Sequence, residues 1–186
     1  MPILDKELDL YPDDLLQRQE LGLEEDHCWW AFYTISRREK ELMRRLVVLD
    51  IPFYCPIIPQ RRRSPAGRFR TSYLPLFPNY VFVYGNKEDR YNSYTTNCIA
   101  RDIEVTDGTQ LTQDLRQLHK LILADVPLTR ESKLEPGQFV RIKSGAFRNY
   151  EGHIVRREGQ TKLLIAVNFL QQGASVLLDN CEVETA

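Results

Sequence analysis

The sequence has few of the residues from which catalytic, metal-binding and redox sites are built. Its three histidines lie in separate segments, and none stands beside a serine or cysteine arranged as a nucleophile. The four cysteines include no close pair, so neither a zinc ribbon nor a dithiol redox motif is present. Phosphate-binding loops, dinucleotide-binding glycine patterns and EF-hand loops are also missing. We therefore expect no enzymatic activity, no metal and no cofactor.

Long apolar runs are missing too. No run approaches the ~20 residues that are needed to cross a bilayer. The first residues, Met-Pro-Ile-Leu-Asp, do not resemble a signal peptide. A content of 42% hydrophobic and 27% charged residues is typical of a folded globular chain, and scattered cysteines are typical of reduced thiols. The expectation is a cytoplasmic monomer without membrane contact, built as one ordinary domain or two small ones.

Charge is distributed unevenly along the chain, although the net charge is only -1. Residues 1–26 contain nine acidic residues against Lys6 and Arg18, whereas residues 27–73 contain ten Lys or Arg against three acidic residues. A basic segment beside an acidic one indicates a surface that faces a polyanion. The acidic leader, residues 1–26, has no sustained periodicity, so we expect it to be either disordered or a loosely docked helix.

The segment 74–85 is the most strongly patterned part of the chain. Its two prolines exclude a helix at the entry, and residues 80–84 are all β-branched or aromatic, which predicts a buried strand. Alternation places Val81 and Val83 on one face, against the core of the domain. The opposite face carries Tyr80, Phe82 and Tyr84. Three aromatic side chains on one face are either covered by a helix or available to a partner.

The flanking sequence predicts alternating strands and helices. Strands are expected at 27–34, 53–58 and 99–106, and helices from Ser36 to before Pro52, at 87–97 and at 111–122. Ser36 and Glu39 have the spacing of a capping box. Residues 60–70 contain five arginines and no acidic residue, which predicts a basic hairpin or long loop. The result is an α+β domain over 27–127, with helices packed on a mainly antiparallel sheet, followed by a short linker at 128–134.

The remaining part, residues 135–186, changes to closely spaced short strands. They are expected at 139–143, 153–157, 163–169, 175–178 and 182–184, with glycines between most of them. Five short strands in about 50 residues are typical of a small SH3-like β-barrel.

Two motifs resemble one known family. Leu76-Phe77-Pro78-Asn79-Tyr80-Val81-Phe82-Val83, preceded by Pro75, is similar to the signature of the N-terminal domain of the NusG family of transcription elongation factors, and most similar to its RfaH-type paralogues. Residues 144–155, Ser-Gly-Ala-Phe-Arg-Asn-Tyr-Glu-Gly-His-Ile-Val, resemble the KOW motif of the same proteins. The resemblance implies an N-terminal α/β sandwich followed by a KOW domain with the SH3-like barrel.

The resemblance also implies an RNA polymerase surface. In the family, this strand helps to form an apolar pocket that holds the clamp helices of the largest polymerase subunit. It assigns Tyr80 and Phe82 to that pocket, with Ile103 and Val105 as walls. Thr95 and Thr96 fall near the position where the family contacts the polymerase gate loop.

A second surface is basic. In the family this side faces upstream DNA and the non-template strand, where phosphate contacts supply affinity without reading sequence. Tyr73 or Phe69 is suited to stacking on an unpaired base. An acidic protein patch is the alternative ligand for the arginines. The candidate nucleic-acid-binding residues are Arg37, Arg38, Arg61, Arg62, Arg63, Arg68, Arg70 and Tyr73.

A third surface is the KOW loop. By resemblance, Phe147 and Ile154 contact a small-subunit ribosomal protein or the termination factor Rho; alternatively Phe147 folds over the end of its own barrel. Ala146 and Asn149 replace the proline and glycine that are usual in the family motif. These differences affect which partner is expected to bind, but they do not change the expected fold. RfaH-type proteins can also fold this segment as a helical hairpin, but its glycines and β-branched residues favour strands.

The sequence thus predicts a transcription elongation, antitermination or termination factor with two binding domains. The alternative is a ribosome-associated or RNA-binding KOW protein, which has no need of the segment 74–85.

Overall fold

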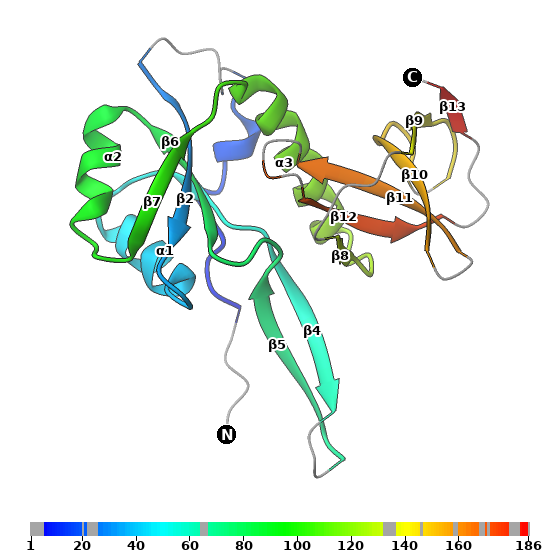
Figure 1. The fold of residues 1–186 in the computed structure, drawn as a ribbon, viewed down its shortest axis with the longest axis horizontal. Helices are drawn as coiled ribbons and strands as arrows, with labels where there is room; N and C mark the ends of the chain where they lie inside the picture. Colours follow the sequence, from blue (N-terminus) through cyan, green and yellow to red (C-terminus); the bar gives the residue numbers. More distant parts are fainter. Residues whose placement is uncertain are drawn as a thin grey trace. The chain divides into compact units, whose positions relative to one another are not determined.

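The chain folds into two compact units, residues 1–112 and 113–186. The computed structural model describes residues 6–19, 21, 26–63, 67–131, 137–145, 147–157, 160–167, 170, 172–178 and 183–185. Figure 1 shows the elements of both units. In the residues described, no helix is long and apolar enough to span a membrane.

The first unit is built on a five-stranded antiparallel sheet with β6 at its centre. The strand order is β1-β3-β6-β2-β7. Its strands are β1 (Leu10–Tyr11), β2 (Cys28–Thr34), β3 (Phe53–Tyr54), β6 (Tyr80–Gly85) and β7 (Ile99–Glu104). The patterned segment 74–85 therefore supplies the central strand, as its composition predicts.

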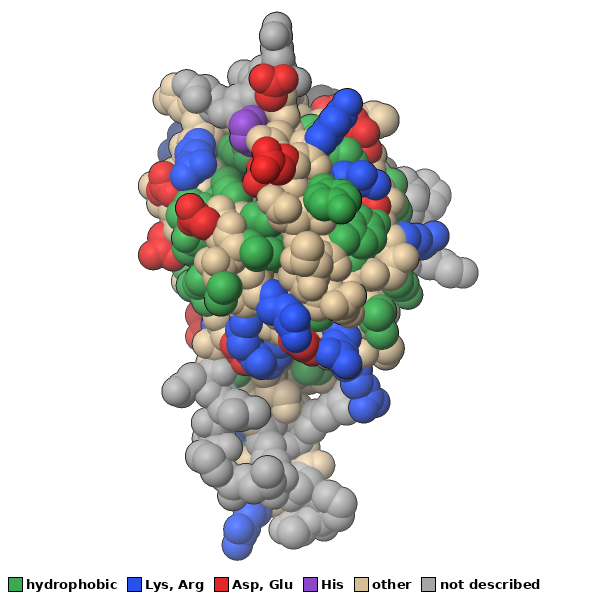
Figure 2. Space-filling model, turned by 90° about the vertical axis from the view of Figure 1, so that its left-hand side faces the viewer, with side chains coloured by type: hydrophobic (Ala, Val, Ile, Leu, Met, Phe, Trp, Pro, Cys, Tyr) green, Lys and Arg blue, Asp and Glu red, His purple; other side chains and the backbone are tan. Residues whose placement is uncertain are grey.

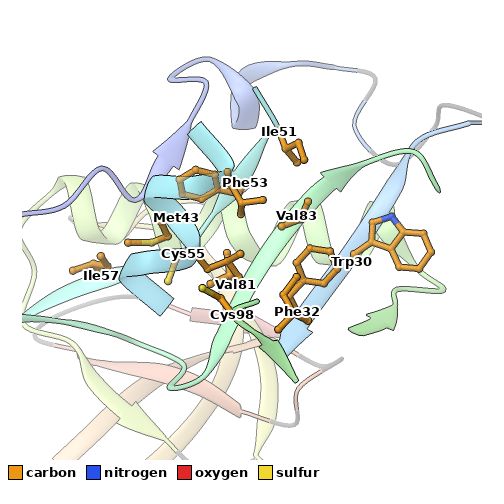
Figure 3. Close-up of a cluster of buried hydrophobic side chains, with 13 residues drawn as sticks. Trp30, Phe32, Met43, Ile51, Phe53, Cys55, Ile57, Val81, Val83 and Cys98 are labelled. Atoms are coloured by element: carbon orange, nitrogen blue, oxygen red, sulfur yellow. The ribbon is translucent and has the colours of Figure 1, made fainter. Parts of the chain in front are cut away.

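Each face of β6 has a different role. Val81 and Val83 are fully buried in a core with Phe32, Phe53 and Leu46, as the alternation predicts (Figure 3). Helices α1 (Glu39–Val48) and α2 (Lys87–Tyr94) pack against β6 and lie on the same side of the sheet (Figure 1). This side of β6 is therefore the interior of the domain.

The aromatic face of β6 is covered along most of its length. Phe82 is fully buried against the ring of Phe77, and the Tyr84 ring lies 5.2 Å from that of Trp29. The Trp29 indole donates a hydrogen bond of 2.9 Å to Thr112 Oγ1, near the start of α3 (Gly108–Leu123). Of the three aromatic side chains predicted for this face, Tyr80 is the one that stays half-buried. Phe82 and Tyr84 on this face are therefore covered, whereas Tyr80 is partly available to a partner.

The capping box expected at Ser36 is wrong. Helix α1 begins at Glu39, its N-cap residue is Arg38, and no side chain caps it. The Glu39 carboxylate, almost fully buried, instead accepts a hydrogen bond of 2.8 Å from the backbone N–H of Asn79. Asn79 has a φ of 67°, a left-handed conformation that asparagine tolerates well. This long-range contact fixes the turn that leads into β6.

The described part of the leader is docked rather than disordered. Strand β1 pairs with β3, and the Tyr11 ring stacks on Phe53 at 6.3 Å. A 3-10 turn, η1 (Leu15–Gln17), follows. The apolar side chains of the leader that are buried are Leu10, Leu15, Leu16 and Leu21. The apolar residues, and not the acidic charge, therefore determine the structure of residues 6–19 and 21.

Strands β4 (Ile57–Arg63) and β5 (Phe69–Pro75) form a separate two-stranded hairpin. It projects from the first unit (Figure 1) and confirms the basic hairpin predicted for residues 60–70. Residues 64–66, at its tip, lie outside the described part.

The expected polar helix after β6 is α2, and it starts with a full capping box. The Asn86 side chain accepts from the N–H groups of Glu88 and Asp89, and Asp89 accepts from the Asn86 N–H at 3.0 Å. Gly85 leaves room for this box, since a Cβ there would lie 2.6 Å from Asp89 Oδ2. Strand β7 follows where 99–106 was predicted, and α3 where 111–122 was predicted.

The second unit contains a six-stranded antiparallel sheet in the order β13-β9-β10-β11-β12-β8. Its strands are β8 (Thr129–Glu131), β9 (Gln138–Ile142), β10 (Glu151–Arg157), β11 (Gln160–Val167), β12 (Gln172–Leu177) and β13 (Val183–Thr185). The predicted short strands are present, and the described residues of this segment do not form a helical hairpin. Its closure into an SH3-like barrel stays a prediction.

The expected linker at 128–134 is partly a strand. Thr129–Glu131 form β8, which pairs with β12 through Gly173, Ala174 and Ser175. Polar composition suggested a linker because a three-residue strand carries almost no periodicity. The backbone pairing thus makes Thr129–Glu131 part of the second sheet. Helix α3 also continues into the second unit, where Gln117 Oε1 accepts from the Glu151 N–H at 2.9 Å.

Candidate functional site

The open part of the aromatic face lies where β2, β6 and β7 run side by side. Tyr33 of β2 is paired in register with Tyr80 on one side and with Arg101 on the other. The two tyrosine rings meet edge to face at 5.2 Å, and the Arg101 guanidinium lies over the Tyr33 ring at 5.0 Å. Ile103, half-buried, lies on the same face two residues after Arg101. We call Tyr33, Tyr80, Arg101 and Ile103 the tyrosine surface.

Two of the predicted pocket residues are not accessible. Phe82 is fully buried, and Val105 is only 5% exposed. The family resemblance assigns Phe82 to the pocket, but alternation along the strand gives only the side to which a residue points and not what covers it. Phe82 lies between Tyr54 and Ala31 in the register, so it supports the tyrosine surface from inside the domain.

The two threonines expected near the gate loop differ in accessibility. Thr95 is exposed at the end of α2, where its hydroxyl donates to the Asn92 carbonyl at 2.6 Å. Thr96 is buried; its hydroxyl donates to the Ser93 carbonyl and accepts from the Cys98 N–H. Thr96 therefore stabilises the turn that follows helix α2, and its hydroxyl is not free to contact a partner.

The face of β7 that points to α2 carries a neutralised charge. The Asp102 carboxylate accepts from Arg90 Nε at 2.5 Å and also from the Tyr94 hydroxyl. Burial raises the pKa of Asp102, but the hydrogen bonds from Arg90 and Tyr94 outweigh it and hold that pKa below its usual value. The Arg90 guanidinium also lies over the Trp30 ring at 5.1 Å. This cluster fixes α2 to the sheet and leaves no free charge.

One face of the β4–β5 hairpin combines cations with an aromatic ring. Arg63 lies opposite Phe69 in the register, and the Arg61 guanidinium covers the Phe69 ring at 4.2 Å. Phe69 is 61% exposed. Arg63 also donates to the Gly67 carbonyl at 3.4 Å. This exposed mixture of guanidinium groups and a ring is what single-strand-binding surfaces use.

The other predicted hairpin residues have different positions. Arg62 and Arg70 are register partners in the hairpin, so two cationic residues occupy opposed positions. Arg68 is exposed next to the turn. Tyr73 packs against the core of the first unit. Phe69, and not Tyr73, is therefore the aromatic side chain available for stacking.

The basic residues of α1 are mostly paired with acids. Figure 2 shows Lys and Arg side chains gathered on the lower part of the face that carries α1 and α2. Glu41 accepts from both Arg38 and Arg45, and these hydrogen bonds lower its pKa. Arg44 pairs with Glu7 of the leader at 3.0 Å. Arg37 is exposed, with a φ of 63°. The hairpin, rather than α1, thus carries the charge that is available to a polyanion.

In the second unit, the predicted loop residues are half-buried. The Phe147 ring lies 6.1 Å from Tyr150, edge to face, and Ile154 is half-buried in β10. Asn149 has a φ of 69°, so it adopts the left-handed conformation that the usual glycine would supply. Phe139 was not predicted; it is 42% exposed and packs edge to face on His153.

The described residues do not include a reactive or metal-binding cluster. Burial raises the pKa of Cys28 and of Cys55, which disfavours a nucleophilic thiolate at either position. No group of three His, Cys, Asp or Glu side chains within the described ranges is arranged to hold a metal ion.

A family model described as "Transcription termination factor nusG" matches residues 27–114. Over these residues, just under half of the chain, the sequence is similar to the NusG family. The matched segment runs from the start of β2 into α3 and includes the tyrosine surface and the hairpin. NusG-family proteins are transcription elongation factors and not enzymes. The match ends at residue 114, just inside the second unit, and the leader precedes it.

A solved chain titled "Crystal Structure of MjSpt4:Spt5 complex conformation B" is similar to this chain at 12% identity, covering 85% of this chain and 97% of that chain. Its TM-score is 0.27, which is too low to indicate a shared fold. No curated protein matches the chain.

Tyr33 and Arg101 were not predicted as site residues. A signal for Tyr33 is present in the sequence, because the strand 27–34 is as aromatic as the strand 80–84. Arg101 could be found only with the register, which places it beside Tyr33.

Proposed function

We propose that this chain binds RNA polymerase through its first unit and modulates transcription elongation. The observation that carries the proposal is the tyrosine surface inside the family match. An apolar helix, such as the clamp helices of the largest polymerase subunit, needs aromatic anchors that are rigid and partly exposed. Tyr80 and Tyr33 have this character, since each ring is held by the other and by the sheet.

The hairpin is proposed to hold DNA near the transcription bubble. Arg61 and Arg63 supply positive charge, and Phe69 supplies a ring on which an unpaired base can stack. Phosphate contacts of this kind give affinity that falls as salt concentration rises. This surface adds to polymerase binding without requiring a specific DNA sequence.

The second unit is proposed to recruit a further protein, either a small-subunit ribosomal protein or a termination factor. Phe147 and Ile154 remain the candidate contacts, and Phe139 joins them because it is exposed. The choice between antitermination and termination depends on which partner this unit binds. An RNA-binding KOW protein is the alternative function, but it leaves the tyrosine surface without a role.

The polymerase proposal is tested by replacing the exposed anchors and leaving the buried ones intact. Tyr33→Ala and Tyr80→Ala together should weaken binding to purified core RNA polymerase by roughly 2–4 kcal/mol, the usual cost of aromatic hot spots. Phe82 is excluded from the test because truncating a buried Phe costs about 3–5 kcal/mol of stability. The matched control is Tyr91→Ala, since Tyr91 is 73% exposed on α2. Equal affinity of the double variant, the control and the unmodified protein would refute the proposal.

A further inference from the structure

We propose that Arg101 recognises a carboxylate on the protein that docks on the tyrosine surface. The partner segment would then be a helix with an apolar face and an Asp or Glu beside it. This inference rests on the proposed function, because it specifies the ligand chemistry of the same surface.

The geometry prepares Arg101 for such a contact. Its guanidinium lies over the Tyr33 ring at 5.0 Å, while the Tyr33 hydroxyl receives a hydrogen bond of 3.4 Å from the Asn79 side chain. Tyr33 is held from a second direction by the edge of Tyr80. Stacking on a fixed ring orients the planar guanidinium and leaves its N–H groups free to bind a carboxylate in a bidentate manner. Less conformational entropy is lost on binding when the side chain is already placed.

The charge of Arg101 is not neutralised within the described residues. Its side chain is exposed, and no described carboxylate forms an ion pair with it. The neighbouring Asp102 points to the opposite face, where Arg90 and Tyr94 engage it. The two faces of β7 therefore differ: the cation on one face is paired inside the protein, and the cation on the other lies at the rim of an apolar surface.

The surroundings favour a protein carboxylate over a nucleic-acid phosphate. A nucleic-acid backbone is usually held by several cations in a groove. On this face the residues next to Arg101 are neutral: Tyr33 is its register partner, Tyr80 lies beyond Tyr33, and Ile103 follows two residues along β7. A single cation beside half-buried aromatic and aliphatic side chains is suited to a mixed interface, in which apolar contacts give affinity and one charge pair gives specificity.

The test compares substitutions at Arg101 in the full chain, with purified core RNA polymerase as the probe. Arg101→Gln removes the charge and should weaken binding by about 5–30-fold, and Arg101→Glu should weaken it further because like charges then repel. Arg101→Lys keeps the positive charge but lacks the planar guanidinium, so its affinity for the polymerase should lie between that of Arg101→Gln and that of the unmodified protein. The effect of Arg101→Gln should shrink at high ionic strength. Lys87→Gln, which removes an exposed charge on α2, should leave binding unchanged.

A Tyr80→Ala variant measured in parallel separates this inference from the proposed function. If Tyr80→Ala weakens binding and the Arg101 variants do not, the inference is overturned and the polymerase surface stands. If none of them weakens binding, the proposed function fails as well. If Arg101→Gln weakens association with bubble DNA but not with polymerase, the ligand is a phosphate and the carboxylate assignment is wrong. A Lys substitution at one acidic polymerase residue that restores binding of Arg101→Glu would identify the pair.

Discussion

Replacing Leu15 with alanine tests whether the leader is an integral part of the first unit. The Leu15 side chain is fully buried. Removal of its three outer carbons takes away about 2–3 kcal/mol of transfer free energy, and the cavity raises the total to as much as about 5 kcal/mol. Leu8, in the same leader, is 48% exposed, so Leu8→Ala should cost less than about 1 kcal/mol.

The assay is urea unfolding followed by tryptophan fluorescence. Both tryptophans of the chain, Trp29 and Trp30, lie in β2, so the signal reports on the first unit. Leu15→Ala should lower the urea concentration at the midpoint of unfolding, with little change in the slope of the unfolding free energy against urea concentration. Leu8→Ala provides the matched control. Equal midpoints for Leu15→Ala, Leu8→Ala and the unmodified chain would mean that the leader is detached in solution and that its docking is wrong.

Three further predictions concern particular side chains. Asp102→Asn should cost about 1–3 kcal/mol at neutral pH, because it weakens the bonds to Arg90 and Tyr94. Because the pKa of Asp102 is lower in the folded state, its ionised carboxylate contributes to the free energy of unfolding above its unfolded pKa of about 3.9, and this contribution is lost as pH falls through the folded-state pKa. Asp102→Asn should therefore lose less stability on acidification than the unmodified chain. The same pH dependence of stability in both proteins would contradict this. Gly85→Ala should cost about 0.5–2 kcal/mol in thermal unfolding because its Cβ displaces Asp89 from the capping box, and a neutral effect would show that the box adapts. Replacing Arg61 and Arg63 with Gln should reduce the slope of log DNA affinity against log salt concentration by about 0.7–0.9 for each phosphate that is no longer neutralised. The controls Arg44→Gln and Arg45→Gln should leave this slope unchanged, because the charges of Arg44 and Arg45 are paired with acidic residues. Equal slopes for all variants would show that the hairpin does not contact DNA.

The sequence predicted the elements whose side chains repeat with a clear period. The strand around Val81 and Val83 was placed correctly because a run of β-branched and aromatic residues has few other uses. The hairpin and the three helices were found for similar local reasons. Where the expectation was wrong, a contact between distant parts of the chain decided the outcome.

Three residues illustrate this. Glu39 does not cap its own helix because a turn residue 40 positions away offers it a backbone N–H. Leu15 is buried although the leader is acidic, because a few leucines outweigh solvated charge once the edge strand β3 is available. Arg101 is identified as a site residue only by the pairing of β2 with β7, which places it beside Tyr33. Periodicity gives the face of a residue, and tertiary structure decides whether that face is covered.

The most direct test of polymerase binding through the tyrosine surface is site-specific photocrosslinking from position 80. A photoreactive phenylalanine analogue would replace Tyr80 in one sample and Tyr91 in another, and each protein would be bound to core RNA polymerase and irradiated. We predict a crosslink from position 80 to the largest polymerase subunit and none from position 91. A crosslink from position 91 alone, or to another subunit from position 80, would contradict this.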